Sequence, residues 1–187
     1  MKRCGWVTDD PLYMDYHDHE WGQPVHDDRT HFEFLVLESA QAGLSWITIL
    51  RKRENYREAY DNFQPEIVAT YDTSKLDSLL NNAGIVRNRR KIEASINNAK
   101  CFLEVQKEFG TFDRYIWAFV KNQSLIGHWK DLSEVPASTE LSDQISKDMK
   151  RRGFRFIGTT IIYSYLQAVG IIIDHTIDCF CYQNANK

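Results

Sequence analysis

Apolar residues recur at helical spacing along most of this 187-residue chain, and no segment alternates apolar and polar residues convincingly. The clearest amphipathic segment is residues 88–109, where Ile92, Ile96 and Ala99 fall on one face before Gly110 ends the pattern. Caps and breakers predict further helices over residues 28–41, 45–62, 65–70, 73–82, 112–121, 139–152, 159–169 and 174–181. We therefore expect an all-α fold of about eight or nine helices.

The first 27 residues are expected to be irregular, because Pro11, Gly22 and Pro24 interrupt them. The length predicts a single domain over residues 1–187, and the absence of linker-like runs or repeats agrees with this. Hydrophobic residues make up 43% of the chain and charged residues 26%, which is typical of a globular protein.

Net charge and hydropathy narrow the functional classes. The formal net charge of −3 argues weakly against a nucleic-acid partner, although a local basic face is enough for one. Two basic clusters, at residues 51–53 and 87–91, could form such a face. No apolar stretch is long enough to span a membrane, and the N-terminus lacks the apolar core of a signal peptide. We expect a cytoplasmic protein with no membrane partner.

Cysteine and histidine spacing predicts a metal site. Cys4 and His17 form a C-x12-H pair, and His175 and Cys179 form an H-x3-C pair. If residues 174–181 are helical, the second pair shares one helix face. Two thiolates and two imidazoles suit tetrahedral zinc and leave no position for a reactive water, so the zinc would be structural. It would join the N-terminal segment to the C-terminal one.

Other interpretations of this spacing remain open. His175 and Cys179 could simply be packed residues, and His19, Cys181 and Asp18 are rival ligands. Cys101 stands alone in a predicted helix and fits a small core residue.

Two further features suggest binding surfaces. Aromatic residues gather at the N-terminal end, which suggests a dense aromatic pocket: Trp6, Tyr13, Tyr16, Trp21 and Trp46.

A basic helix end near Arg151 is followed by an apolar turn and by Gly158, Thr159 and Thr160, which open a new helix. Backbone N–H groups at that helix start would make a phosphate seat, so residues of about 150–170 resemble a helix-hairpin-helix motif that binds the DNA backbone. A plain connection between two helices is the alternative.

Several longer motifs point to one family. They are Arg3-Cys4-Gly5-Trp6, Tyr16-His17-Asp18, Glu20-Trp21-Gly22, Gln41-Ala42-Gly43-Leu44-Ser45-Trp46, Ala83-Gly84-Ile85 with Arg87, and Gly158-Thr159-Thr160 with Asp174-His175 and Cys179. From about residue 2 to residue 182 the sequence resembles the 3-methyladenine DNA glycosylase I family of the helix-hairpin-helix superfamily. The resemblance implies a compact all-α fold with a lesion pocket between two lobes. It also implies one structural zinc on Cys4, His17, His175 and Cys179.

The implied partner is double-stranded DNA that contains alkylated bases, and the implied reaction releases free 3-methyladenine. Alkylation at N3 makes the base a cation and a good leaving group, so recognition matters more than strong acid catalysis. Aromatic rings bind such a cation favourably. The resemblance places the catalytic carboxylate at Glu38, puts Tyr16 and Trp46 around the base, and lines the pocket with Trp6, Tyr13 and Trp21. The base must first leave the duplex, and Leu44 on the Gly43 turn is our candidate to fill the gap.

Two positions depart from the wider superfamily. The aspartate that many members place two residues before a histidine is Ile173 here, with Asp174 displaced by one, so Asp174 is expected to support a zinc ligand. Thr160 occupies the place of the nucleophilic lysine of bifunctional members, which predicts a monofunctional enzyme. Nothing in the chain requires more than a monomer.

Two alternatives to this hypothesis remain. The chain could be a non-catalytic, zinc-stabilised binder of alkylated DNA, or a zinc hydrolase. The lack of an H-E-x-x-H motif or a comparable one argues against the hydrolase.

Overall fold

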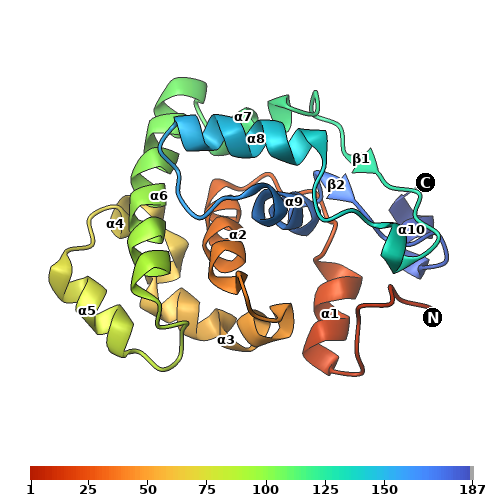
Figure 1. The fold of residues 1–187 in the computed structure, drawn as a ribbon, viewed down its shortest axis with the longest axis horizontal. Helices are drawn as coiled ribbons and strands as arrows, with labels where there is room; N and C mark the ends of the chain where they lie inside the picture. The colour runs from red at the N-terminus through yellow and green to blue at the C-terminus, as the bar shows by residue number, and fades with distance from the viewer. Residues whose placement is uncertain (186–187) are drawn as a thin grey trace.

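A computed structural model describes residues 1–185 of the chain as a helical protein (Figure 1). The α-helices are α1 (Pro11–His19), α2 (Asp28–Gln41), α3 (Trp46–Ala59), α4 (Pro65–Val68), α5 (Thr73–Asn81), α6 (Arg89–Phe109), α7 (Phe112–Ala118), α8 (Glu140–Arg151), α9 (Thr159–Ala168) and α10 (Phe180–Ala185). Two 3-10 turns, η1 (Asp61–Phe63) and η2 (Leu132–Glu134), and two strands, β1 (Leu125–Ile126) and β2 (Ile172–Ile173), complete the fold. Over the part of the chain that is described, no helix has the length and apolar character needed to cross a membrane.

Most helices begin and end where the sequence predicts. The Asp27 side chain accepts the N–H of Thr30 at 2.8 Å and so caps α2. Asn88 caps α6 in the same way, and Gly110 ends that helix with a positive φ of 88°. Ser45 precedes α3 as predicted, although its hydroxyl bonds Thr48 Oγ1 instead of a backbone N–H.

The expectation of a purely helical chain needs one correction. Strands β1 and β2 form a parallel pair in which Leu125 lies opposite Ile172. The N–H groups of Leu125 and Gly127 donate to the carbonyls of Ile171 and Ile173, both at 2.9 Å. Each strand has only two residues, which is too short to produce an alternating sequence pattern.

The N-terminal segment is more regular than expected, because α1 forms where the sequence suggested irregular chain. Asp10 accepts the N–H of Leu12 at 2.9 Å, and Pro11 occupies the first helical position. An acidic N-cap followed by proline is a recognised helix start, so Pro11 begins this helix and does not break it.

The C-terminal segment is less regular than expected. Residues 174–179 form a turn instead of the predicted helix, with the Cys179 N–H donating to the Thr176 carbonyl at 2.8 Å, and α10 begins only at Phe180. The preceding run of three isoleucines at 171–173 favours extended chain. His175 and Cys179 therefore do not share a helix face.

Helix α2 forms the centre of the molecule (Figure 1). It contacts α3, α6, α7 and α9, and all of its residues from His31 to Ala40 are buried. A helix enclosed on all sides carries apolar residues around its whole circumference, which explains why Phe32, Phe34 and Leu37 point in different directions. Glu38 is thus carried into the interior by the most buried helix of the fold.

An ionic cluster fixes α1 against this centre. Arg53 of α3 donates to both Glu20 carboxylate oxygens, at 2.7 and 2.6 Å, and to Glu33 of α2 at 2.6 Å. Its guanidinium also lies over the Phe34 ring, with 5.2 Å between the guanidinium carbon and the ring centroid. The cluster holds the residue that ends α1 beside α2 and α3. The segment that precedes α1 and helix α10 lie near each other at one side of the molecule (Figure 1).

Candidate active site

One pocket, with a volume of about 260 Å³, opens between α1, α2, α3 and α9. The loop that contains η2 closes a further side through Leu132, Val135, Pro136 and Ala137. Seven residues predicted from the sequence to act on base or DNA line it together: Trp6, Tyr13, Tyr16, Trp21, Glu38, Trp46 and Thr160. Those positions span more than 150 residues of sequence.

Aromatic rings form one wall of the pocket. The Trp6 ring lies 5.0 Å from both the Tyr13 and the Trp21 ring, measured between centroids. The Tyr16 and Trp46 rings lie 5.5 Å apart on the α2 and α3 side. Such surfaces favour a flat ligand, and their π faces attract a cation.

Two polar groups on this side have unusual surroundings. The indole nitrogen of Trp46 is buried and has no hydrogen-bond acceptor among the described residues. Tyr16 is 4% exposed, and burial together with the nearby Glu38 raises the pKa of its phenol well above the usual range. Tyr16 therefore stays neutral and keeps a proton to donate.

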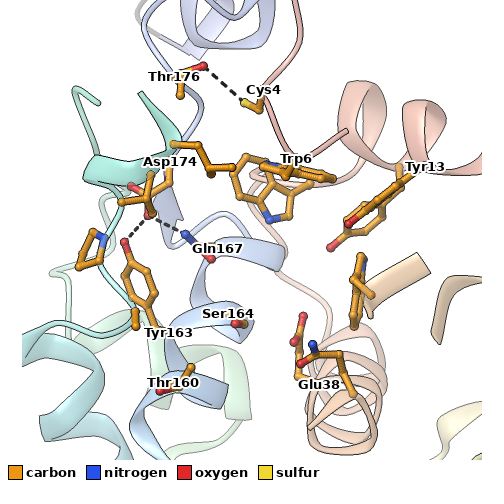
Figure 2. Close-up of a pocket in the computed structure, with 18 residues that line it drawn as sticks. Cys4, Trp6, Tyr13, Glu38, Thr160, Tyr163, Ser164, Gln167, Asp174 and Thr176 are labelled. Carbon is orange, nitrogen blue, oxygen red and sulfur yellow. Dashed lines mark hydrogen bonds between the residues drawn. The ribbon is translucent and has the colours of Figure 1, made fainter. Parts of the chain in front are cut away.

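Glu38 is the most unusual group of the site. It lies in the last turn of α2, is 4% exposed, and still faces the pocket (Figure 2). Burial raises the pKa of its carboxyl group to about 8, and no charged neighbour or hydrogen bond offsets that shift. Near neutral pH this carboxyl group is therefore mainly protonated.

Asp174 lies on the opposite side of the pocket and has a different environment. Its carboxylate accepts hydrogen bonds from the Tyr163 hydroxyl and from Gln167 Nε2 at 2.8 Å (Figure 2), and from Trp129 Nε1 at 2.7 Å. Three donors satisfy the carboxylate, so it is poorly suited to remove a proton. The expected contact with a zinc ligand is not among these bonds, and Asp174 instead holds the pocket wall together.

Apart from Thr160, the polar side of the pocket was not predicted from the sequence. Thr160, Ser164 and Gln167 line it from one face of α9, with Tyr163 beside them. Positions 160, 164 and 167 have the spacing of a helix face, and they interrupt an otherwise apolar helix. That polar stripe was the signal that could have found them.

The four predicted metal ligands lie together and are fully buried. The Sγ of Cys4 lies 3.5 Å from His175 Nδ1, and the Sγ of Cys179 lies 3.5 Å from His17 Nε2 and 3.7 Å from His175 Nδ1. A tetrahedral zinc with Zn–S bonds of about 2.3 Å and Zn–N bonds of about 2.0 Å sets such atoms about 3.5 Å apart. The cluster could hold a metal ion, and its donor set fits zinc.

Protonation of the two thiols is coupled, because the hydrogen bond with Cys179 and burial raise the pKa of the Cys4 thiol above its usual range. The Cys4 thiol, together with the His17 and His175 rings, lowers the pKa of the Cys179 thiol by hydrogen bonding to its sulfur. The other ring nitrogens are occupied, because His17 Nδ1 bonds Asp18 at 2.8 Å and His175 Nε2 bonds the Trp21 carbonyl at 3.3 Å. Each imidazole therefore turns its second nitrogen into the cluster: His175 Nδ1 faces both sulfurs, and His17 Nε2 faces Cys179 Sγ and also accepts the Cys4 backbone N–H at 3.4 Å.

The rival ligands occupy other roles. Asp18 orients His17 and is itself held by two bonds from Arg3, at 2.8 and 2.6 Å. His19 bonds Asp15 on the surface. Cys181 lies near His17 and Asp18 as part of a smaller, second group that could hold a metal.

The Cys/His cluster also supports the pocket. Trp6 meets the His17 ring edge-on with 5.2 Å between centroids, and Trp21 meets the His175 ring edge-on at 4.7 Å. Cys4 belongs to the cluster and lines the pocket as well. Loss of order in the cluster would therefore directly displace the aromatic rings that form the pocket wall.

The predicted DNA-contacting residues are separated. Leu44 is 39% exposed on the turn between α2 and α3, whereas Thr160 faces the pocket. Gly158 precedes α9 without a side-chain cap, and the Thr159 hydroxyl bonds Ser142 of α8 at 2.8 Å. In the basic clusters, Arg51 bonds Asp10 at 2.6 Å and Arg53 lies in the interior, so residues 51–53 do not form a free basic face.

The chain thus combines an α-helical fold with a buried carboxyl group in an aromatic pocket and an adjacent Cys₂His₂ cluster, and a pocket lined in this way suits a flat ligand. The methyladenine glycosylase family model matches residues 6–182. DNA-3-methyladenine glycosylase 1 of Escherichia coli (strain K12) is 48% identical over 182 residues, which cover 97% of each chain. The chain therefore belongs to the methyladenine glycosylase family.

Solved structures show the same similarity. A crystal structure of 3-methyladenine DNA glycosylase I matches with a TM-score of 0.94 and 47% identity, covering 96% of this chain and 99% of that one. A variant of 3-methyladenine DNA glycosylase I in complex with 3-methyladenine matches with a TM-score of 0.93 and 38% identity, covering 96% and 97%. The helical fold is thus shared with structures of this family.

Proposed function

We propose that this protein is a monofunctional DNA glycosylase, which hydrolyses the N-glycosidic bond of N3-methyladenine in alkylated DNA and so starts base excision repair. The observation that carries the proposal is the buried Glu38 carboxyl group, without a charged partner, in the aromatic pocket of a methyladenine glycosylase family member. The relatives of known name and the complex with 3-methyladenine support the choice of substrate.

Recognition follows from the charge of the damaged base. A cationic ring inserted between the aromatic groups gains cation–π energy of about 0.5–2 kcal/mol per contact. The positive charge also favours the ionised form of Glu38, which lowers the pKa of that carboxyl group from about 8. The carboxylate then accepts a hydrogen bond from the exocyclic amino group of the base. A neutral adenine offers no charge to offset the cost of ionising Glu38.

Bond cleavage needs little acid catalysis. When the bond between C1′ and the base breaks, its electron pair moves onto the cationic ring and leaves a neutral base. Positive charge then develops on the sugar, and water adds at C1′ and loses a proton. The Glu38 carboxylate stabilises the cationic base during its entry and the sugar charge afterwards. Asp174 keeps the opposite wall in place through its three donors.

A monofunctional reaction agrees with the pocket lining. Bifunctional glycosylases need an amine nucleophile at C1′, and no lysine lines the described pocket. Thr160 occupies the corresponding part of α9. The products would be free 3-methyladenine and an uncut strand with an abasic site.

Contacts with double-stranded DNA would come from two places. Leu44 would fill the gap that the extruded base leaves in the duplex. The N–H groups of Gly158, Thr159 and Thr160 at the start of α9 would bind a phosphate, as in a helix-hairpin-helix motif formed by α8 and α9. A monomer of one domain, with its pocket between two lobes, is enough for this scheme.

We further propose that the Cys/His cluster holds one structural zinc. Cys4, His17, His175 and Cys179 would supply all four ligands, so the ion has no open position for a substrate or a reactive water. When bound, the zinc would cross-link the N-terminal segment to the C-terminal turn. It would take part in no step of the reaction.

Base release tests this proposal. DNA treated with a methylating agent is incubated with the protein, and the free bases are separated by chromatography. We expect 3-methyladenine to be released by wild type, and release to fall about a hundredfold in Glu38→Gln, which keeps the shape but not the charge. A folded, metal-containing wild type that binds the DNA but releases nothing would instead indicate a non-catalytic binder of alkylated DNA.

A further inference from the structure

The turn at Gly43 and Leu44 connects two pocket residues. It leaves α2 one turn after Glu38 and enters α3 at Trp46. Gly43 has a φ of +82°, a backbone conformation that residues with a side chain rarely adopt. This conformation lets the chain reverse sharply. The position of Leu44 thus depends on what holds this short turn.

Lys91 of α6 reaches this turn from a distant part of the sequence. Its Nζ donates to the carbonyl of Ala40 at 2.8 Å and to that of Ala42 at 2.6 Å. Carbonyls at the end of a helix have no partner within the helix, and a cation there also interacts favourably with the helix dipole. Gln41 Nε2 completes the arrangement by donating to the Leu44 carbonyl at 2.7 Å.

The environment of Lys91 is unusual for a lysine in a basic stretch. Its neighbour Arg89 pairs with Asp77 and Glu93, whereas no described carboxylate lies within ion-pair distance of Lys91. Partial burial lowers the pKa of the Lys91 amine. The fold therefore places a partly buried cation on two backbone carbonyls beside the pocket, and not on an acid.

We propose that Lys91 is a positioning residue for base extrusion, which holds the Gly43–Leu44 turn in the place from which Leu44 enters the duplex. The inference rests on the proposed glycosylase function and adds a residue to it. Lys91 acts through the turn, so its loss should slow the extrusion of a base from duplex DNA. It should leave the pocket itself able to bind a free base.

The experiment compares two readouts in four proteins: wild type, Lys91→Met, Lys91→Arg and Lys107→Met. The first readout is the affinity for free 3-methyladenine, followed by tryptophan fluorescence. The second is the single-turnover rate of base release from methylated duplex at saturating protein. Lys107→Met is the matched control, because it removes a cation from the exposed far end of the same helix.

We expect Lys91→Met to lower the release rate about tenfold, the effect of losing hydrogen bonds from a charged group, with free-base affinity within about twofold of wild type. Lys107→Met should match wild type in both readouts. Lys91→Arg keeps the charge and the donors and should recover most of the rate. If Lys91→Met does not fold, Lys91→Gln takes its place, because it also removes the charge and should show the same loss of rate.

Coupling to Leu44 gives a second criterion. If Lys91 works through the turn, Lys91→Met should slow release in wild type but add little in a Leu44→Ala background. Equal losses of rate and free-base affinity, additive effects of the two substitutions, or an unchanged rate would each overturn the proposal. Absence of release by wild type would overturn the glycosylase function itself, which the wild-type arm reports separately.

Discussion

At the scale of the residue, Glu38 is a carboxyl group that the fold buries without compensation. Burial of a carboxyl group disfavours its charged form, and here the pKa rises to about 8. The Asp174 carboxylate on the other side of the pocket is equally buried but receives three hydrogen bonds. The two acids therefore have separate roles, one responsive to a charged ligand and one structural.

The pH dependence of stability should reveal this cost. The folded protein holds a proton on Glu38 that the unfolded chain loses above about pH 4.5. The stability that Glu38 contributes is therefore full below about pH 4.5, declines as pH rises, and is lost above about pH 8. Glu38→Gln lacks this titration.

Thermal melts of both proteins from pH 4 to pH 9 provide the measurement. We expect the melting temperature of Glu38→Gln to exceed that of wild type by a margin that widens up to about pH 8 and then stays constant. A margin that does not change with pH would mean that Glu38 has an ordinary pKa in the folded protein.

At the scale of the element, the turn between α2 and α3 carries the Leu44 prediction. Leu44 is exposed and does not line the pocket, so Leu44→Ala should leave the affinity for free 3-methyladenine unchanged. It should weaken binding to methylated duplex DNA, because the gap in the stack is no longer filled. Equilibrium titrations with the free base and with the duplex measure both effects. Equal losses in both would contradict the assignment of Leu44 to the duplex.

Helix boundaries were largely predictable from local signals. The helices predicted over residues 28–41 and 88–109 are observed within one residue of those bounds, and Gly110 ends the second as predicted, because caps act within a few residues. The α1 helix lies outside the prediction because proline within a helix breaks it, whereas proline in the first turn after an N-cap such as Asp10 favours a helix. The two short strands depend on a tertiary pairing that no local pattern records.

The candidate site was only partly predictable. The aromatic wall followed from composition and from family resemblance, and the polar stripe of α9 was overlooked. His175 and Cys179 were paired on the assumption of a helix, yet they meet across a turn, so their proximity was predicted for the wrong geometric reason. Lys91 could not have been found, since its partners are backbone carbonyls some 50 positions earlier.

At the scale of the whole molecule, the two ends of the chain build one unit. Cys4 and His17 from the N-terminal segment meet His175 and Cys179, and the imidazoles support Trp6 and Trp21. Pocket and cluster are therefore mechanically coupled.

Removal of metal should consequently affect folding and base binding together. Chelation, with the metal content measured before and after, is expected to lower the melting temperature and the affinity for free 3-methyladenine, and added zinc should restore both. Cys4→Ser should behave like the chelated protein, whereas the control Cys101→Ser, in a half-buried position of α6, should not. Full base affinity in metal-free protein would contradict the coupling.

The mass of a methylated oligonucleotide duplex after reaction tests the central claim most directly. The account predicts a strand of full length that has lost one 3-methyladenine and gained water, which is an intact abasic strand, from wild type and far less of it from Glu38→Gln. A strand of unchanged mass, despite binding by folded protein, would contradict the assignment as an enzyme. A strand cut at the damaged position would contradict the monofunctional mechanism.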